Sequence, residues 1–258
     1  LMKTDKKVGL VLGAGGARGY AHIGLLQVFQ ENDIPVDIVT GCSMGALIGG
    51  LYAAGCDMYI LEKFCENFDI MRYADVNLKK GGVIGGNKVL DLIKMFTKNM
   101  KFGQTKLPFT CVAVDLCSST LKAFDSGYIH DAIRASISIP GAFSPYEIDG
   151  RLYIDGGVLE RLPIDEAKNL GADKIIAVDV NYRGWEQPKP KNLIETITLT
   201  MNIPDWEFSR QNEKKADVLV VPDIKKYDPF EFSVSKEVVK LGRQAALAKL
   251  DEIKEAIK

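Results

Sequence analysis

Histidine is scarce in this chain, whose 258 residues include only His22 and His130. That number excludes most metal centres built on several histidines. The five cysteines are odd in number and form no Cys-x-x-Cys pair. We therefore expect reduced thiols rather than a disulfide framework or a zinc site. No apolar run approaches the roughly 18 residues that a membrane-spanning helix needs.

An excess of either charge is also missing. Lys+Arg 33 against Asp+Glu 34 gives a formal net charge of -1, so nucleic acid is not expected as a partner. Hydrophobic residues at 47% and charged residues at 26% exclude a disordered or fibrous chain. The length predicts one large domain over residues 1–258. The charged start, with no apolar stretch behind it, predicts that there is no signal peptide and that the location is cytoplasmic.

Short apolar runs that stop at glycines alternate with helical patterns. Val8–Leu12 and Ile38–Thr40 predict two strands, each followed by a helix, the first ending near Asn32 and the second running from Ser43 to Gly55. This alternation indicates an α/β fold whose parallel sheet is covered on both faces. It continues with strands at 109–114, 174–180 and 218–221, helices at 128–136, 163–171 and 234–257, and a hairpin around Asp149-Gly150.

Residues 58–107 break this alternation, and we expect them to form a lid- or cap-like insertion. Within them, residues 79–106 hold seven lysines and one acid, Asp91. One side of a predicted helix there carries Val89, Leu90, Leu92, Ile93 and Phe96. The favoured interpretation is an ordinary helix with a core-facing stripe. The alternative is peripheral contact between residues 79–106 and an anionic membrane surface.

Gly41-Cys42-Ser43-Met44-Gly45 fits the Gly-x-Ser-x-Gly pattern of a nucleophile elbow. In such an elbow a strand enters a tight turn, a helix leaves it, and Gly41 and Gly45 let neighbouring backbone approach closely. The serine hydroxyl then stands exposed at a helix N-terminus. The alternative is a serine that merely caps a helix of small residues.

A histidine base fits poorly with this serine. His130 alone follows Ser43, and it lies inside a predicted helix; two strands before the serine are also too few for the usual α/β-hydrolase elbow. Asp155-Gly156-Gly157, after the predicted hairpin, offers a carboxylate instead. A carboxylate acts as a general base when burial raises its pKa. The alternative is an ordinary Asp-Gly-Gly turn.

The glycine-rich segment Gly13–Gly19 also has two interpretations. A dinucleotide fingerprint that starts at Gly13 fails, because Arg18 occupies its last glycine position. Backbone N–H groups in a glycine turn before a helix instead suit an oxyanion hole, with Arg18 locking the loop through hydrogen bonds.

These three motifs, in this order, together with the block Arg134–Pro145, resemble the bacterial branch of the patatin-like phospholipase family. The resemblance implies a three-layer α/β/α fold with a central, mostly parallel sheet. It also implies a Ser43–Asp155 dyad supported by Gly41, Gly45, Gly156 and Gly157, and no metal or organic cofactor. Gly15 and Gly16 with their neighbours Gly13, Ala14 and Arg18 would form the oxyanion hole. Two positions depart from the family pattern: Ala14 replaces a glycine, and Arg161 stands where many members have asparagine before Leu-Pro.

The function expected from these residues and this resemblance is hydrolysis of acyl esters of lipids, phospholipids or lysophospholipids, through an acyl-enzyme. Two alternatives remain open. One is an acyltransferase on the same scaffold, and the other is a non-catalytic nucleotide-binding module that uses the glycine loop.

Overall fold

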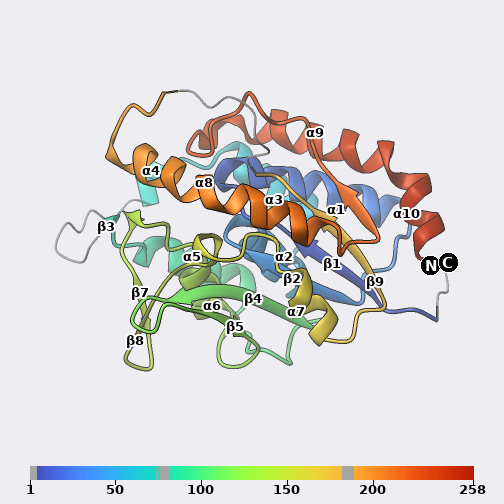
Figure 1. Ribbon diagram of the computed structural model, residues 1–258, viewed down its shortest axis with the longest axis horizontal. Coiled ribbons are helices and arrows are strands. Elements are labelled where there is room, and N and C mark those ends of the chain that lie inside the picture. Colours follow the sequence, from blue (N-terminus) through green and yellow to red (C-terminus); the bar gives the residue numbers. More distant parts are fainter. Residues whose placement is uncertain (1–4, 74, 76–81, 182–188) are drawn as a thin grey trace.

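The computed structural model describes residues 5–73, 75, 82–181 and 189–258 (Figure 1). At its centre these residues form an eight-stranded sheet in the order β10-β9-β1-β2-β4-β8-β7, with β5 also paired to β4. Its strands are β1 (Val8–Leu12), β2 (Ile38–Cys42), β4 (Phe109–Asp115), β5 (Thr120–Phe124), β7 (Tyr146–Ile148), β8 (Arg151–Asp155), β9 (Lys174–Val178) and β10 (Val218–Val220). A separate pair joins β3 (Gly82–Ile84) to β6 (Gly141–Phe143).

The five strands from β10 to β4 run parallel, and β5, β8 and β7 are antiparallel additions. Every residue of β1, β2 and β4 is buried, because helices cover both faces of this part of the sheet. Leu10 and Leu12 point to one face and Val11 to the other, as the two-residue repeat of a strand requires.

Most helices lie on the face of Leu10 and Leu12 (Figure 1). They are α1 (Ala21–Glu31), α2 (Met44–Ala53), α5 (Asn87–Thr97), α6 (Ile129–Ser136) and α9 (Ser235–Ala248), with α3 (Met58–Glu66) packed on α1 and α9. The short helices α4 (Ile70–Tyr73) and α10 (Leu250–Ala256) complete the set. α7 (Ile164–Asn169) covers the opposite face. The long α8 (Leu193–Glu213) is tied beside it, where the Asn212 amide donates to Glu160 at 2.9 Å.

Helices α1 and α9 approach unusually closely. A Cβ on Gly24 would lie 2.0 Å from the carbonyl oxygen of Val239, and one on Gly242 would lie 2.0 Å from that of Ala21. Each helix therefore presents a glycine to the other's backbone, which holds α9 firmly against the helix that follows the glycine loop.

The α/β three-layer architecture predicted from sequence is confirmed. The hairpin is confirmed as well: Asp149 and Gly150 have φ values of 51° and 75°, which fit a type I′ turn. The last helix differs from its prediction, because it breaks at Lys249 into α9 and α10. Strand β5 and helix α8 were not predicted. In the part of the chain that the structure describes, no helix has the length and apolarity needed to cross a membrane.

Candidate active site

Ser43 stands at a strained turn between β2 and α2. Its φ of 54° and ψ of -122° lie in a region that residues with a Cβ rarely adopt. The turn is also crowded: a Cβ on Gly41 would lie 2.4 Å from the carbonyl oxygen of Gly45, and one on Gly45 would lie 2.0 Å from that of Leu12. A side chain at either position would collide with this backbone, so both residues must be glycine.

The strand register brings Asp155 to the same place. β5 pairs with Cys111–Asp115 of β4, whereas β2 pairs with Phe109–Val112, so β2 and β5 lie on opposite edges of β4. β8 pairs with β4 from Ala113 to Asp115 and must share the edge of β2. The carboxyl ends of β2 and β8 thus meet head to head. Directly after β8, Gly156 packs tightly against β4, because a Cβ there would lie 2.4 Å from the Val112 carbonyl oxygen.

The two side chains are in direct contact. The Ser43 hydroxyl donates to Asp155 Oδ2 at 2.6 Å. The backbone N–H of Gly157 donates to Asp155 Oδ1 at 2.7 Å, and the Cys42 thiol lies 3.9 Å from the same oxygen. These contacts fix the rotation of the carboxyl group, so that one oxygen is turned toward the hydroxyl.

Burial raises the pKa of the Asp155 carboxyl to about 6, although the hydrogen bonds from Ser43 and Gly157 and the charge of Arg161 act in the opposite direction. A carboxylate of this pKa is a far better proton acceptor than an ordinary solvated aspartate, and it is still ionised at neutral pH.

The glycine loop before the 3₁₀ helix η1 (Gly16–Tyr20) leaves two N–H groups free. Within the described residues, those of Gly15 and Gly16 donate to no protein acceptor, and both residues line a pocket together with Ser43. Gly16 has a φ of +55°, and its Cβ would lie 2.3 Å from the Pro229 carbonyl oxygen. Only glycine fits there without displacing the neighbouring backbone.

The N–H groups of the other three residues expected in the oxyanion loop already donate to protein carbonyl oxygens. Gly13 donates to the Val178 oxygen at 3.0 Å, Ala14 to the Arg161 oxygen at 3.0 Å, and Arg18 to the Gly15 oxygen at 3.2 Å. The prediction is corrected in this respect: Gly13, Ala14 and Arg18 hold the loop in place, and the free donors are Gly15 and Gly16.

Further contacts support the loop and the elbow. The Arg18 Nε donates to the Tyr227 oxygen at 2.7 Å, and Ala17 N–H donates to the Pro229 oxygen at 2.8 Å. Ser136 Oγ accepts from the backbone N–H of Ser43 at 2.9 Å and donates to the Val112 oxygen at 2.6 Å. The elbow is thus anchored to both α6 and β4.

Both histidines have partners other than the Ser43 hydroxyl and the Asp155 carboxyl group. His22 Nε2 bonds the Gly13 oxygen at 2.9 Å, so this nitrogen carries the proton, and burial lowers the pKa of His22 to about 4. His130 stacks on the Tyr128 ring, and its Nε2 lies 3.7 Å from Asp131. The neutral His22 supports the glycine loop from beneath.

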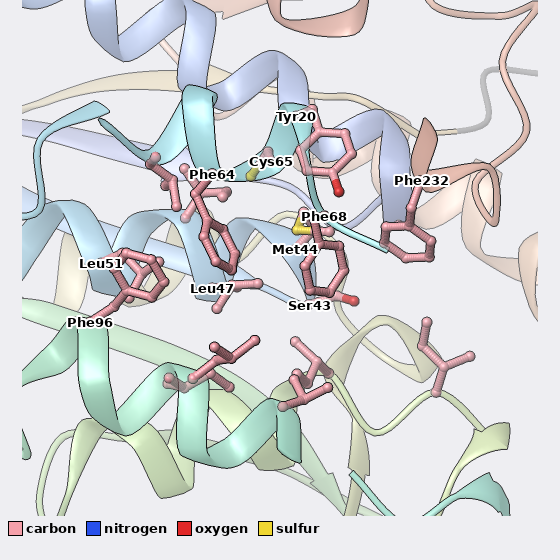
Figure 2. A pocket seen from close by; sticks show the side chains of 18 of the residues that line it. Tyr20, Ser43, Met44, Leu47, Leu51, Phe64, Cys65, Phe68, Phe96 and Phe232 are labelled. Carbon is pink, nitrogen blue, oxygen red and sulfur yellow. The ribbon is translucent and has the colours of Figure 1, made fainter. Parts of the chain in front are cut away.

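Ser43 lies between two cavities of opposite character. The first, about 850 Å³ including its mouth, is almost wholly apolar. In Figure 2, Ser43 and Phe232 lie toward one end of it and Leu51 and Phe96 toward the other. The second is a smaller polar pocket that contains Asp155, Arg18, Arg161 and Asn181. Among the lining residues that the structure describes, only Gly16, Ser43 and Ile139 are common to both cavities.

Residues 58–107 supply much of the wall of the apolar cavity. Leu61, Phe64, Cys65 and Phe68 come from the α3 region, and Val89, Leu92, Ile93 and Phe96 come from α5. The apolar side of α5 is therefore turned inward. Arg134 ties this region to the core, because its guanidinium donates to the Gly85 oxygen at 2.8 Å and to Ser138 Oγ at 2.7 Å.

The profile of the family described as patatin-like phospholipase matches residues 10–168. The chain belongs to the patatin-like phospholipase family. That stretch contains the elbow, the glycine loop and Asp155.

Relatives of known sequence agree with this assignment. An uncharacterized NTE family protein of Mycobacterium tuberculosis is 40% identical over 180 residues, which are 69% of this chain and 50% of that protein. The lysophospholipase NTE1 of Pyricularia oryzae is 29% identical over 282 residues, covering 97% of this chain and 19% of that protein. The chain thus spans half or less of the curated relatives that it matches.

Solved structures show the same fold at low identity. VipD from Legionella pneumophila aligns with a TM-score of 0.64 and 13% identity, over 98% of this chain and 67% of that one. ExoU in its complex with SpcU from Pseudomonas aeruginosa aligns with a TM-score of 0.60 and 14% identity, over 98% of this chain and 53% of that one.

Several residues of the site were missed from the sequence. Ser136 falls in the Arg134–Pro145 block that carried the resemblance, so a signal was present, although its role was not evident. Tyr227 and Pro229 act through backbone oxygens, which leave no trace in residue type.

Proposed function

We propose that this chain hydrolyses acyl esters of lipids, with phospholipids or lysophospholipids as the substrate class. The observation that carries the proposal is the 2.6 Å contact between Ser43 Oγ and Asp155 Oδ2, at the junction of an apolar cavity and a polar pocket. The names of curated relatives, among them lysophospholipases, support the same class.

In the first step, Asp155 Oδ2 takes the proton of Ser43 as Oγ attacks the ester carbonyl carbon. The carbonyl π electrons move to its oxygen, which the N–H groups of Gly15 and Gly16 stabilise. When the tetrahedral intermediate collapses, the C–O bond to the alcohol breaks. The alcohol oxygen receives the proton from Asp155, and the acyl group stays on Ser43.

In the second step, water replaces the alcohol. Asp155, ionised again, removes a proton from the water as its oxygen attacks the acyl carbon. The second tetrahedral intermediate uses the same N–H groups, and Ser43 leaves with the proton from Asp155. The fatty acid is released, and both side chains return to their starting state.

The apolar cavity is proposed to hold the acyl chain, and residues 58–107 to act as the cap over it. Burial of a chain there removes hydrocarbon from water, at about 0.8 kcal/mol for each methylene group. Because the apolar side of α5 faces the cavity, a membrane contact by residues 79–106 would depend mainly on lysine charge, with Met95, 59% exposed, as an apolar side chain on the outer surface. Lys79 and Lys80 of that segment lie outside the described residues.

A fluorophosphonate probe tests the proposal. We expect it to label Ser43 in the wild type and to label neither Ser43→Ala nor Asp155→Asn appreciably. Hydrolysis of a panel of acyl esters should fall in parallel by at least about 10³-fold. His130→Gln is the matched control and should keep its activity. Unchanged hydrolysis by a folded Asp155→Asn variant would refute the dyad.

The two alternative functions give different results. An acyltransferase would transfer the acyl group to added alcohol or lysolipid in preference to water, which product analysis detects. A nucleotide-binding module would bind a dinucleotide and resist labelling. Two free N–H groups offer little for a diphosphate, since the next two, of Ala17 and Arg18, already have acceptors.

A further inference from the structure

Arg161 occupies a buried position beside the proposed catalytic pair. Its side chain is 8% exposed and lines the polar pocket with Ser43 and Asp155. Its backbone oxygen accepts from Ala14 N–H at 3.0 Å, so the residue is fixed to the glycine loop. Gly157 lies close enough that a Cβ there would be 3.5 Å from Arg161 Cγ. The backbone therefore sets where this guanidinium can reach.

The described lining of the polar pocket carries two guanidinium groups, those of Arg18 and Arg161, and one carboxyl group, that of Asp155. Burial is the main cause that lowers the pKa of Arg18; the charge of Arg161 lowers it further, whereas Asp228 and Asp179 oppose this. Two guanidinium groups that line one pocket favour an anion there, the more so after Asp155 has accepted a proton.

The position of the pocket indicates which part of a substrate this anion belongs to. An acyl chain in the apolar cavity with its carbonyl at Ser43 leaves the alcohol part on the other side, in the polar pocket. Asn181, 7% exposed, adds an amide to this lining. Beyond Thr198 and Phe230 the pocket adjoins a groove that has both lysines and acids along it. Whatever group the alcohol ends in would lie in that groove.

We propose that Arg161, assisted by Asn181, binds the phosphate of the leaving alcohol and thereby selects phosphate-bearing acyl esters over neutral ones. This inference rests on the proposed ester hydrolase function. It makes Arg161 a specificity-determining residue of this chain, at a position where many members of the family have asparagine.

The test compares two substrates with the same palmitoyl chain in the same mixed micelles, lysophosphatidylglycerol and monopalmitoylglycerol. The quantity is the ratio of their kcat/KM values. Any effect of Arg161 on the pKa of Asp155 acts on both substrates and cancels in this ratio. In Arg161→Asn we expect the ratio to fall by about 10- to 100-fold, mainly through KM, since a hydrogen bond to a charged group is lost. Arg161→Lys should recover part of it. Lys168→Gln, an exposed change on α7 that lines neither the polar pocket nor the groove, should alter the ratio less than about twofold.

A second readout is independent of turnover. Glycerol 3-phosphate should slow fluorophosphonate labelling of Ser43 in the wild type more than glycerol does, and this protection should be lost in Arg161→Asn. Equal protection by inorganic phosphate and by glycerol 3-phosphate would mean that the pocket takes any free phosphate, which would overturn selection of the leaving alcohol.

If the wild type hydrolyses both substrates but their kcat/KM ratio is unchanged in a folded Arg161→Asn variant, the role of Arg161 is refuted and the proposed function stands. The same holds if kcat/KM falls by the same factor for both substrates. The second result would mean a structural role. If Ser43 is not labelled and neither ester is cleaved by the wild type, the proposed function fails, and this inference fails with it.

Discussion

The two cavities that meet at Ser43 are built from different parts of the fold. Side chains of α2, α3 and α5 form most of the apolar cavity, so the same periodic patterns that make these helices amphipathic also line it. The polar pocket is formed by segments that follow strands: the glycine loop after β1, Asp155 to Arg161 after β8, and Asn181 after β9. Under the proposed function, the helices would supply affinity for hydrocarbon, whereas the loops at the strand ends would supply the chemistry.

The largest expected effect comes from the boundary between the two cavities. Gly16→Ala should reduce kcat on a soluble ester by at least about 10²-fold, because its Cβ would collide with the Pro229 oxygen and displace a proposed oxyanion donor. Gly127→Ala is the matched control: Gly127 also has a positive φ, of +83°, but its Cβ would meet no atom within 4 Å. It should lower Tm and leave kcat unchanged. Equal kcat values for the two variants would remove Gly16 from the oxyanion hole.

The apolar cavity is tested by a larger side chain at Leu51, toward the end away from Ser43. Leu51→Phe should lower kcat/KM for a palmitoyl ester by about tenfold and leave a butyryl ester nearly unaffected, because filled volume excludes the distal methylenes. Leu247→Phe, an exposed change on α9, should affect neither ester. An equal loss on both esters would mean that Leu51 does not line the path of the chain.

The polar side is tested by pH. Since Asp155 must be ionised to accept a proton and its pKa is raised to about 6, kcat/KM should fall by about tenfold for each pH unit below that value. Arg161→Asn should move this acid limb of the pH–rate profile to higher pH, because the charge of Arg161 lowers the pKa of Asp155. A limb near pH 4 would contradict the burial of the carboxyl group.

The buried Asp155 carboxyl group should lower the stability of the folded protein at neutral and higher pH. Its folded pKa of about 6 exceeds an unfolded value near 3.9, so its stabilising contribution is present below about pH 4 and is lost as pH rises through 6. Asp155→Asn should therefore raise Tm by about 5 °C at pH 8, with no gain below pH 4. Asp115 supplies the opposite sign: its hydrogen bond with Arg151 lowers its pKa, so Asp115→Asn should lower Tm at pH 8. Thermal unfolding across this pH range measures both.

The last prediction concerns lysines on α5 and directly after it, and its readout is vesicle binding rather than turnover. Replacing Lys88, Lys94 and Lys98 by glutamine should weaken binding to anionic vesicles and leave binding to neutral vesicles unaffected. The control replaces Lys236 and Lys240 on α9. Sedimentation with vesicles measures both variants, and an unaltered affinity of the first would eliminate the membrane contact of residues 79–106.

The sequence predicted the strands that carry the motifs and the order in which they occur. Glycine patterns made this possible, because at Gly41 and Gly45 the close approach of backbone leaves no other choice of residue. β5 was missed because its half-exposed pattern is short, and α8 because Pro204 within it disfavours a helix.

The site was predictable only where residue type carries the chemistry. The apolar stripe of α5 looks the same whether it fills a core or lines a cavity, so its role was undecided until the neighbouring helices were placed. The oxygens of Tyr227 and Pro229 act from some two hundred positions beyond the glycine loop. No local pattern could reveal contacts of that kind.

The close glycine contacts between α1 and α9 have a consequence for expression of partial chains. The family match stops at residue 168. The backbone oxygens of Tyr227 and Pro229, which hold the glycine loop, lie further along the chain, just before α9, and α9 packs closely on α1. A shortened polypeptide ending before residue 227 would keep Ser43, Asp155 and the glycine loop but lose the contacts from Tyr227 and Pro229. We therefore expect it to be a poor catalyst, because the proposed anion-binding turn would have lost its external support.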